Sequence, residues 1–170
     1  MVSGQCTANG QRQIQALLIL SLLVICLFLM AGCAQKSAIG AINDRATMAV
    51  LQFEKIEEGV SGVVYREVNN FETLVGTTKT PILLAFYNPL SEVNAQIIPQ
   101  LEQMADDDQG KLTILWIDAT SQTRLAESFG ATNLPQFTVM VDATVKRSLV
   151  GFDSQGPEKL EQLVSPYLQK

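Results

Sequence analysis

Histidine is absent from the sequence, and cysteine occurs only three times, always within the first 33 residues. Histidine is the commonest general base near neutral pH and the commonest metal ligand, so both roles would fall to other side chains. Beyond residue 33 the chain has no thiol and cannot form an internal disulfide. It also shows no phosphate-binding loop, no Ser-His-Asp set and no metal-ligand cluster. We therefore expect no cofactor and no metal, and binding is favoured over catalysis.

Positive charge is also scarce, because 12 Lys and Arg face 17 Asp and Glu, which gives a net charge of −5. An acidic chain has no electrostatic attraction for a phosphate backbone, so we expect no nucleic-acid partner. The charges are interspersed, as in an ordinary soluble surface. The one acidic run, Asp106-Asp107-Asp108, has three consecutive side chains that point in different directions. We interpret it as a solvated loop.

One long apolar run is present, from Ala16 to Met30, and it carries no charge. Its fifteen residues fall short of the roughly 20 that span a bilayer, and they suit the core of a signal peptide. A polar leader precedes the run, with Arg12 as its only charged side chain. The alternative is an uncleaved anchor helix from Ile14 to Ala34.

The apolar run ends in Leu29-Met30-Ala31-Gly32-Cys33, which resembles the lipobox of bacterial lipoproteins. In that family the cysteine thiol receives a diacylglyceryl group, the chain is cut before it, and the new amino group is acylated, commonly with palmitate. The resemblance implies a cleaved signal peptide over residues 1–32 and a lipid on Cys33 that anchors the protein to a membrane. The domain would then lie outside the cytoplasm, on the periplasmic side of the cell envelope. Alanine rather than aspartate at position 34 favours the outer membrane over the inner.

A tether and an amphipathic helical linker are predicted for residues 33–58. Apolar residues recur there in steps of four and three, which places them on one helical face: Ile42, Ala46, Ala49, Phe53, Ile56 and Val60. The simplest interpretation is a helix that spaces the domain from the membrane or folds back onto it. The alternative is a weak homodimer through residues 42–60, although so few heptads are marginal for a coiled coil.

The remaining chain, residues 59–170, alternates between strand and helix patterns. Strands are expected at 63–68, 82–87, 112–118, 137–141 and 146–150, and helices at 71–75, 91–105, 122–129 and 157–168. This order predicts parallel crossover units closed by one hairpin. The fold class is therefore α/β, with a central mixed β-sheet flanked by helices. The uninterrupted apolar strand at 82–87 is typical of a strand that is covered on both faces.

Three local features of this domain resemble thioredoxins. Phe86-Tyr87 followed by Pro99 resembles their aromatic pair and helix proline, and Gly151 matches a glycine before the last helix. Residues 129–135, Phe-Gly-Ala-Thr-Asn-Leu-Pro, resemble the signature that ends in a cis-proline. The resemblance covers about residues 63–168 and implies the thioredoxin-like fold with a cis bond before Pro135. It also implies a peptide-binding groove beside this proline, rimmed by Tyr87, Pro89, Leu90 and Leu134.

The Cys-x-x-Cys motif of thioredoxins is missing. The same alignment places Ser91 and Asn94 at the two cysteine positions, Ala85 at the buried acid and Leu90 at the tryptophan. Disulfide exchange needs an activated thiolate and a second thiol to resolve the mixed disulfide, and a serine hydroxyl provides neither. We interpret Ser91 as a helix cap, with Asn88 as the alternative cap.

Three functional hypotheses follow. The leading one is a membrane-anchored, redox-inactive thioredoxin-like protein that binds a protein or an extended peptide, as an assembly or chaperone-like envelope factor. The second is a divergent thiol-disulfide oxidoreductase, or a glutathione-type enzyme in which Ser91 polarises a bound thiol. The third is a purely structural module on a membrane tether.

Overall fold

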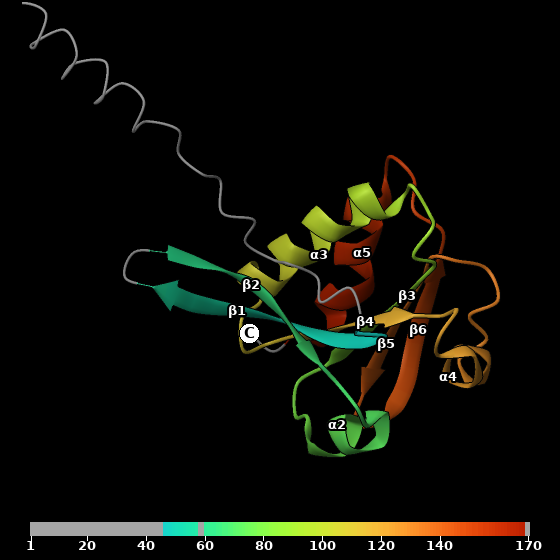
Figure 1. The fold of residues 1–170 in the computed structure, drawn as a ribbon, viewed down its shortest axis with the longest axis horizontal. Helices are drawn as coiled ribbons and strands as arrows, with labels where there is room; N and C mark the ends of the chain where they lie inside the picture. The colour runs from blue at the N-terminus through green and yellow to red at the C-terminus, as the bar shows by residue number, and fades with distance from the viewer. Residues whose placement is uncertain (1–45, 58–59, 169–170) are drawn as a thin grey trace, which may run out of the picture. The chain divides into compact units, whose positions relative to one another are not determined.

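The computed structural model describes residues 46–57 and 60–168. The predicted signal peptide, Cys33 and the tether up to residue 45 lie outside the described residues. Along the chain the structure runs through six strands and their helices (Figure 1): β1 Met48–Glu57, β2 Val60–Glu67, α2 Phe71–Thr77, β3 Ile82–Tyr87, α3 Asn94–Asp107, β4 Thr113–Asp118, α4 Thr123–Ser128, β5 Gln136–Val141, β6 Thr144–Val150, α5 Gly156–Val164 and the 3-10 helix η1 Ser165–Tyr167. No helix among these residues is long and apolar enough to cross a bilayer.

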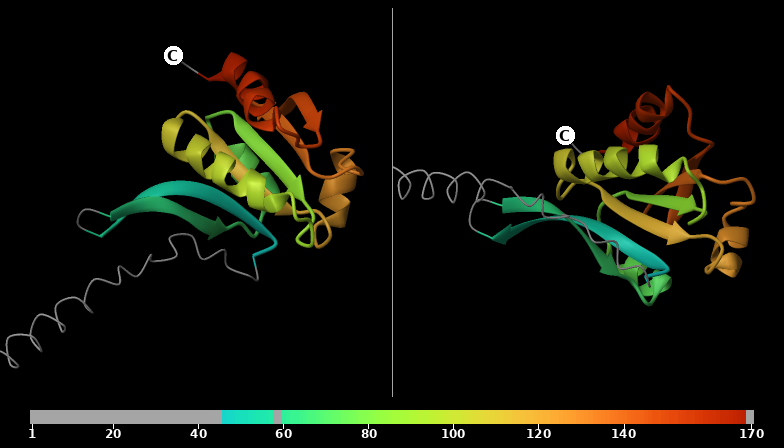
Figure 2. Two further views of the ribbon diagram at one scale, coloured as in Figure 1. Left: turned by 90° about the horizontal axis from the view of Figure 1, so that it is seen from above. Right: turned by 45° about the horizontal axis from the view of Figure 1, so that its top comes forward.

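The six strands form one mixed sheet in the order β2-β1-β4-β3-β5-β6. Only β3 and β4 are parallel neighbours, joined through α3, and every other pairing is antiparallel. Helices α3 and α5 lie together over one face in both views of Figure 2. Residues of α2 and α4 pack against the other face. The predicted α/β class, with a mixed sheet between helices, is confirmed.

The position of β3 between two hydrophobic cores explains its uninterrupted apolar sequence. Leu83 and Ala85 belong to the core under α3 and α5, whereas Leu84 and Phe86 belong to the core under α2 and α4. Successive side chains of a strand point to opposite faces, so a strand covered on both sides needs apolar residues at every position. All four side chains are fully buried.

The helix predicted for the linker is wrong for the described part of that segment, because Met48–Glu57 is strand β1. Residues 48–51 are buried in alternation between the two cores, with Met48 and Val50 on one face and Leu51 on the other. A short, fully apolar run fits both a strand and a helix, and periodicity alone cannot separate them. Here the open edge of β4 decides, since it supplies backbone partners for residues 48–51.

The predicted domain boundary at residue 59 is wrong for the same reason. Strand β1 lies between β2 and β4, so the domain includes at least residues 48–57. The outer halves of β1 and β2 pair only with each other and extend past β4 (Figure 1). Helix α3 contacts β2 where the outer part begins, because the hydroxyl of Tyr65, opposite Leu51, donates to Glu102 at 2.9 Å. Residues 48–51 are buried inside the sheet, so they are not available to the weak homodimer predicted through residues 42–60.

Candidate functional site

One edge of the sheet brings the predicted site residues together. Tyr87 ends β3 and pairs with Asp118, which ends β4, while Gln136 begins β5 opposite Phe86. The bond between Leu134 and Pro135 is cis, as predicted. The carbonyl oxygen of Pro135 accepts a hydrogen bond from the amide of Gly151 at 2.8 Å. Gly151 has a φ of 82°, a conformation that favours glycine.

The turn between β3 and α3 is organised by Asn88. Its side-chain Oδ1 accepts a hydrogen bond from the amide of Leu90 at 2.9 Å. Its carbonyl oxygen accepts from the amide of Ser91 at 3.0 Å and from Nδ2 of Asn94 at 2.8 Å. An asparagine that bonds the backbone two residues ahead forms an Asx turn. The turn is therefore held by one residue that no sequence motif singled out for this role.

The prediction that Ser91 caps the helix is wrong. Helix α3 begins at Asn94, its cap residue is Val93, and no side chain caps it. Among the described residues the Ser91 hydroxyl forms no hydrogen bond, and no acid or base contacts it through one. Asn88, the alternative cap, bonds Leu90 instead of a helix amide. Residues 92 and 93 form a turn before α3, and Ser91 bonds the first helix amide, that of Asn94, through its carbonyl oxygen at 3.2 Å instead of its hydroxyl.

Asn94, at the second cysteine position, is half-buried at the start of α3. Its Nδ2 is bonded to Asn88, while its buried Oδ1 has no donor among the described residues. A buried acceptor without a donor costs free energy. The Asn94 side chain therefore stabilises the turn through Nδ2, while its Oδ1 opposes that stabilisation.

Ala85 occupies the position that the resemblance assigns to a buried acid, and its methyl group is fully buried in the core under α3 and α5. Next to it on the same face, the ring of Tyr87 stacks on Trp116 with centroids 3.9 Å apart. Trp116 is a core residue, as predicted. Burial raises the pKa of the Tyr87 hydroxyl, and the charge of Asp118 raises it further. Tyr87 therefore stays neutral at physiological pH.

Asp118 ends β4 at this edge, and both of its carboxylate oxygens already accept hydrogen bonds. Oδ1 accepts from the amide and hydroxyl of Thr120, at 2.8 and 2.6 Å, and Oδ2 accepts from the hydroxyl of Ser121 at 2.7 Å. Burial raises the pKa of Asp118, but these hydrogen bonds from Thr120 and Ser121 outweigh it and leave the pKa lowered. The carboxylate thus stays ionised and closes the loop after β4.

The predicted groove residues differ in how far they are exposed. Leu90 is 92% exposed, and Pro89 is exposed beside it. Tyr87 and Leu134 are half-buried and pack against opposite cores, and Pro135 is buried. We call these five residues the turn surface. Its outermost apolar group is Leu90, and its polar groups are the Tyr87 hydroxyl and the backbone.

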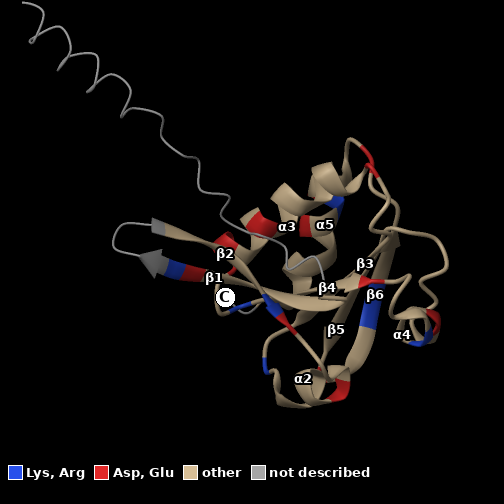
Figure 3. Cartoon of the chain, viewed as in Figure 1, with Lys and Arg blue, Asp and Glu red and all other residues tan. Residues whose placement is uncertain are grey.

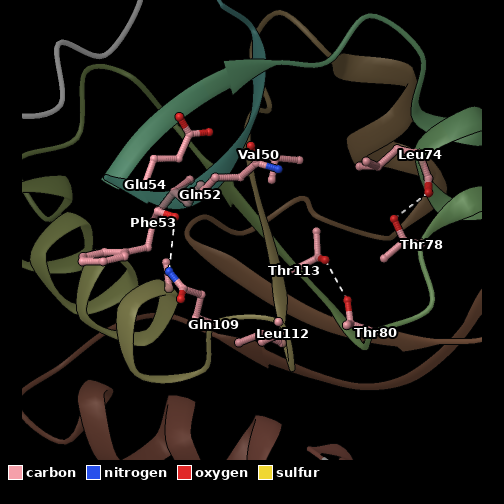
Figure 4. A pocket seen from close by; sticks show the side chains of 13 residues that line it. Val50, Gln52, Phe53, Glu54, Leu74, Thr78, Thr80, Gln109, Leu112 and Thr113 are labelled. Carbon is pink, nitrogen blue, oxygen red and sulfur yellow. Dashed lines mark hydrogen bonds between the residues drawn. The ribbon is translucent and has the colours of Figure 1, made fainter. Parts of the chain in front are cut away.

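A hollow of about 350 Å³ at the opposite end of the sheet was not predicted from the sequence. It forms where β1 separates from β4, and the Nε2 of Gln109 donates to the Phe53 carbonyl there at 3.2 Å (Figure 4). Across the hollow the hydroxyls of Thr80 and Thr113 are hydrogen-bonded at 2.7 Å (Figure 4). Its lining is neutral apart from Glu54, which is paired with Arg66. Only the departure of β1 from β4 creates this space, so no sequence motif marks it.

Charged side chains of both signs are dispersed over the helices and outer strands, while β3 and β5 carry none (Figure 3). No group of three or more acids among residues 46–57 and 60–168 is arranged to hold a metal ion. The described site therefore offers apolar contact and hydrogen bonding.

Comparison with known proteins identifies the family. Residues 62–165 match the family model of thioredoxin, which is more than half of the chain, so the chain belongs to the thioredoxin family. The chain is 25% identical over 114 residues to the chloroplastic M-type thioredoxin of Zea mays, covering 67% of this chain and 66% of that protein. It is 29% identical over 92 residues to thioredoxin of Bacillus subtilis, covering 54% and 86%. The match spans less than two thirds of the length of the maize relative.

Solved structures show the same fold. Mitochondrial thioredoxin 3 from Saccharomyces cerevisiae, in its oxidized form, superposes with a TM-score of 0.51 at 17% identity, covering 56% of this chain and 86% of that one. The germline-specific thioredoxin Deadhead from Drosophila melanogaster gives a TM-score of 0.52 at 18% identity, with coverages of 57% and 90%. The thioredoxin-like fold is thus shown by family and by structure.

Proposed function

We propose that this thioredoxin-family protein is a redox-inactive binding protein, anchored to a membrane through Cys33 and acting in the cell envelope as an assembly or chaperone-like factor. One observation carries the proposal: the cis Leu134–Pro135 bond and the turn are kept, while Ser91 and Asn94 stand where the cysteines would be. A retained surface without its reactive atoms supports binding.

The turn surface suits an extended peptide. Leu90 offers an exposed apolar anchor, and the Asx turn of Asn88 holds the loop that carries it. A loop held in place before binding loses less conformational entropy on association, which favours affinity.

Redox inactivity is tested by reduction of insulin with dithiothreitol as the electron source. The unmodified protein should give no turnover above background. The double variant Ser91→Cys with Asn94→Cys serves as the positive control, because it returns both thiols to the same turn. Turnover by the unmodified protein that disappears in Ser91→Ala would instead support the enzymatic hypothesis.

Binding is tested by cross-linking and purification from envelope membranes with two matched variants. Leu90→Asp adds a charge at the turn surface, and Val145→Asp adds one at an apolar residue that is 47% exposed on β6. A specific partner should be lost with Leu90→Asp and kept with Val145→Asp. Equal retention in both variants would rule out the turn surface. Mass spectrometry of the native protein should show a lipid on residue 33, and an intact Met1 start would contradict the anchor.

A further inference from the structure

We propose that the hollow beside the outer half of β1 binds an extended, uncharged segment of a partner protein, which adds to the sheet as a short strand. The segment lies where β4 would run if that strand began earlier than Thr113. This surface is separate from the turn surface and does not depend on a lipid at Cys33. We call it the β1 edge: the backbone of Phe53 and Lys55 together with the hollow.

The backbone of Phe53 and Lys55 faces the side of β1 that β4 leaves open. The Thr47 carbonyl accepts a hydrogen bond from the end of β4, whereas the Met48 carbonyl accepts one from the residue after β2. In an antiparallel sheet successive residues bond to neighbours on alternate sides, so odd-numbered residues of β1 face β4. The pairing with β4 stops at Leu51. No strand among the described residues therefore pairs with Phe53 or Lys55 on that side.

A side-chain amide already occupies one of these open positions. Nε2 of Gln109 donates to the Phe53 carbonyl at 3.2 Å (Figure 4). The amide of glutamine carries the same kinds of donor and acceptor as a peptide group, so Gln109 stands where a further strand would place its backbone N–H. Gln109 is exposed and its bond is at the long end of the usual range, so a strand can displace it at little cost.

The hollow of about 350 Å³ has the position and the lining of a missing strand. Leu51 and Ala105 line it from the side of the core under α3 and α5, and Val50 and Leu74 line it from the side of the core under α2 and α4. It thus reaches both faces of the sheet where β4 begins. Successive side chains of a strand point to opposite faces, so an added strand fills such a space with alternate residues.

The charges around the hollow favour an uncharged segment. Glu54 is its only charged lining residue among those described, and it is paired with Arg66 at 2.7 Å. The other polar groups are neutral, among them the hydrogen-bonded hydroxyls of Thr80 and Thr113 (Figure 4). A charged side chain placed there would lose hydration without gaining a counter-ion, which costs free energy. Apolar and small polar side chains incur no such penalty.

A second copy of this chain fits the β1 edge poorly. The one antiparallel register that uses both Phe53 and Lys55 from each copy pairs Phe53 of one with Lys55 of the other, and it is centred on Glu54. That register sets two Glu54 carboxylates directly opposite each other, and like charges in such a pair are destabilising. The β1 edge therefore suits a different chain, whose uncharged segment pairs through its backbone.

Binding is tested with the full-length protein in detergent micelles and a dye-labelled, end-capped hexapeptide of alternating valine and threonine. Fluorescence anisotropy should show saturable binding, and a matched peptide with glutamate at two of the threonines should bind at least about fivefold more weakly. Hydrogen exchange followed by mass spectrometry should show added protection of residues 52–57. No saturable binding of the neutral peptide, or equal binding of the charged one, would overturn the inference.

Two proline variants locate the peptide. Lys55→Pro removes an N–H on the unpaired side of β1, where proline is tolerated, and should weaken binding about fivefold. Lys146→Pro makes the same exchange on the edge strand β6, at the residue that has no counterpart on β5, and should leave binding unchanged. Equal binding by the two variants would overturn the inference.

A gain of binding separates the β1 edge from a general loss of structure. Gln109→Ala removes the competing side-chain amide, so the peptide should bind about threefold more tightly, and weaker binding would overturn the inference. Loss of binding in Leu90→Asp but not in Lys55→Pro would move the peptide to the turn surface, which overturns this inference and supports the proposed function. A doubled mass in sedimentation that Lys55→Pro abolishes would make a second copy the occupant and overturn it as well.

Discussion

At the residue scale, Asn88 contributes more to the candidate site than the residues at the two cysteine positions. Its side chain and carbonyl oxygen together accept hydrogen bonds from Leu90, Ser91 and Asn94. The Ser91 hydroxyl forms none among the described residues. The Ser91 side chain is therefore passive among the described residues, while hydrogen bonds to Asn88 order the backbone around it.

A pair of variants separates these roles. Asn88→Ala removes the acceptor for the Leu90 amide and should lower the free energy of unfolding by about 1 kcal/mol. Ser91→Ala removes no hydrogen bond and should change it by less than about 0.5 kcal/mol. Urea unfolding followed by tryptophan fluorescence measures both, because Trp116 is buried. A larger loss for Ser91→Ala than for Asn88→Ala would restore the capping role.

Asp118 should confer a pH dependence at the acid end. Its pKa is lowered in the folded state, so it stabilises the fold above its unfolded pKa of about 4, and this contribution is lost as the pH falls through the lower folded value. Asp118→Asn should be less stable at pH 7 than the unmodified protein, and the difference should shrink below pH 4. Urea unfolding from pH 7 to pH 2.5 measures this, with exposed Glu92→Gln as the control variant. A difference that stays constant with pH would contradict it.

At the scale of elements, β1 holds the two parts of the sheet together. It pairs with β2 on one side and with β4 on the other. Met48, Ala49, Val50 and Leu51 are all buried there, which removes apolar area from water on both faces. The match to the thioredoxin family model begins only at residue 62, so the family signature alone would miss this strand.

Two truncated chains test the contribution of β1. A protein that begins at Ala46 should unfold cooperatively in urea, because it keeps every strand of the sheet. A protein that begins at Gly59 should lose cooperative unfolding or precipitate, since β2 loses its partner and the edge of β4 becomes exposed. Circular dichroism and sedimentation compare the two. Equal cooperativity would show that the sheet is stable without β1.

At the scale of the whole molecule, two half-buried tyrosines connect strands to other elements of the fold. The Tyr65 hydroxyl on β2 donates to Glu102 on α3, and burial followed by the Glu102 charge raises the pKa of Tyr65. Burial and then Asp118 raise the pKa of Tyr87. Both side chains therefore ionise at higher pH in the folded protein than in the unfolded chain.

This difference predicts alkaline destabilisation. Above about pH 10 the unfolded chain loses its tyrosine protons first, so the folded protein binds more protons and its free energy of unfolding falls as the pH rises. Tyr65→Phe should be less stable at pH 8 because the bond to Glu102 is lost, and its deficit should narrow above pH 10. Urea unfolding from pH 8 to 11.5, with tyrosine absorbance at 295 nm, measures this. A deficit that is constant across that range would contradict the prediction.

The sequence by itself determined the α/β class, the five strands from β2 to β6, and the cis bond before Pro135. Each of these follows from local information: apolar runs, glycines, prolines and the spacing of the family motifs. It also determined that residues 91 and 94 are Ser and Asn, and that every cysteine lies within the first 33 residues.

Only the tertiary structure decided three features: that residues 48–57 form a strand, that Asn88 organises the turn, and that the chain enters the sheet beside the end of β4. Residues 48–51 fit a helix and a strand equally well, and only the open edge of β4 selects the strand. The sequence makes Asn88 one of two candidate helix caps. In the structure α3 begins at Asn94, and the Asn88 side chain accepts a hydrogen bond from the Leu90 amide. The entry of the chain beside the turn surface depends on pairing between residues about 70 positions apart, such as Thr47 and Asp118. Contacts of that range are properties of the folded sheet, because no local pattern specifies which strand edges will meet.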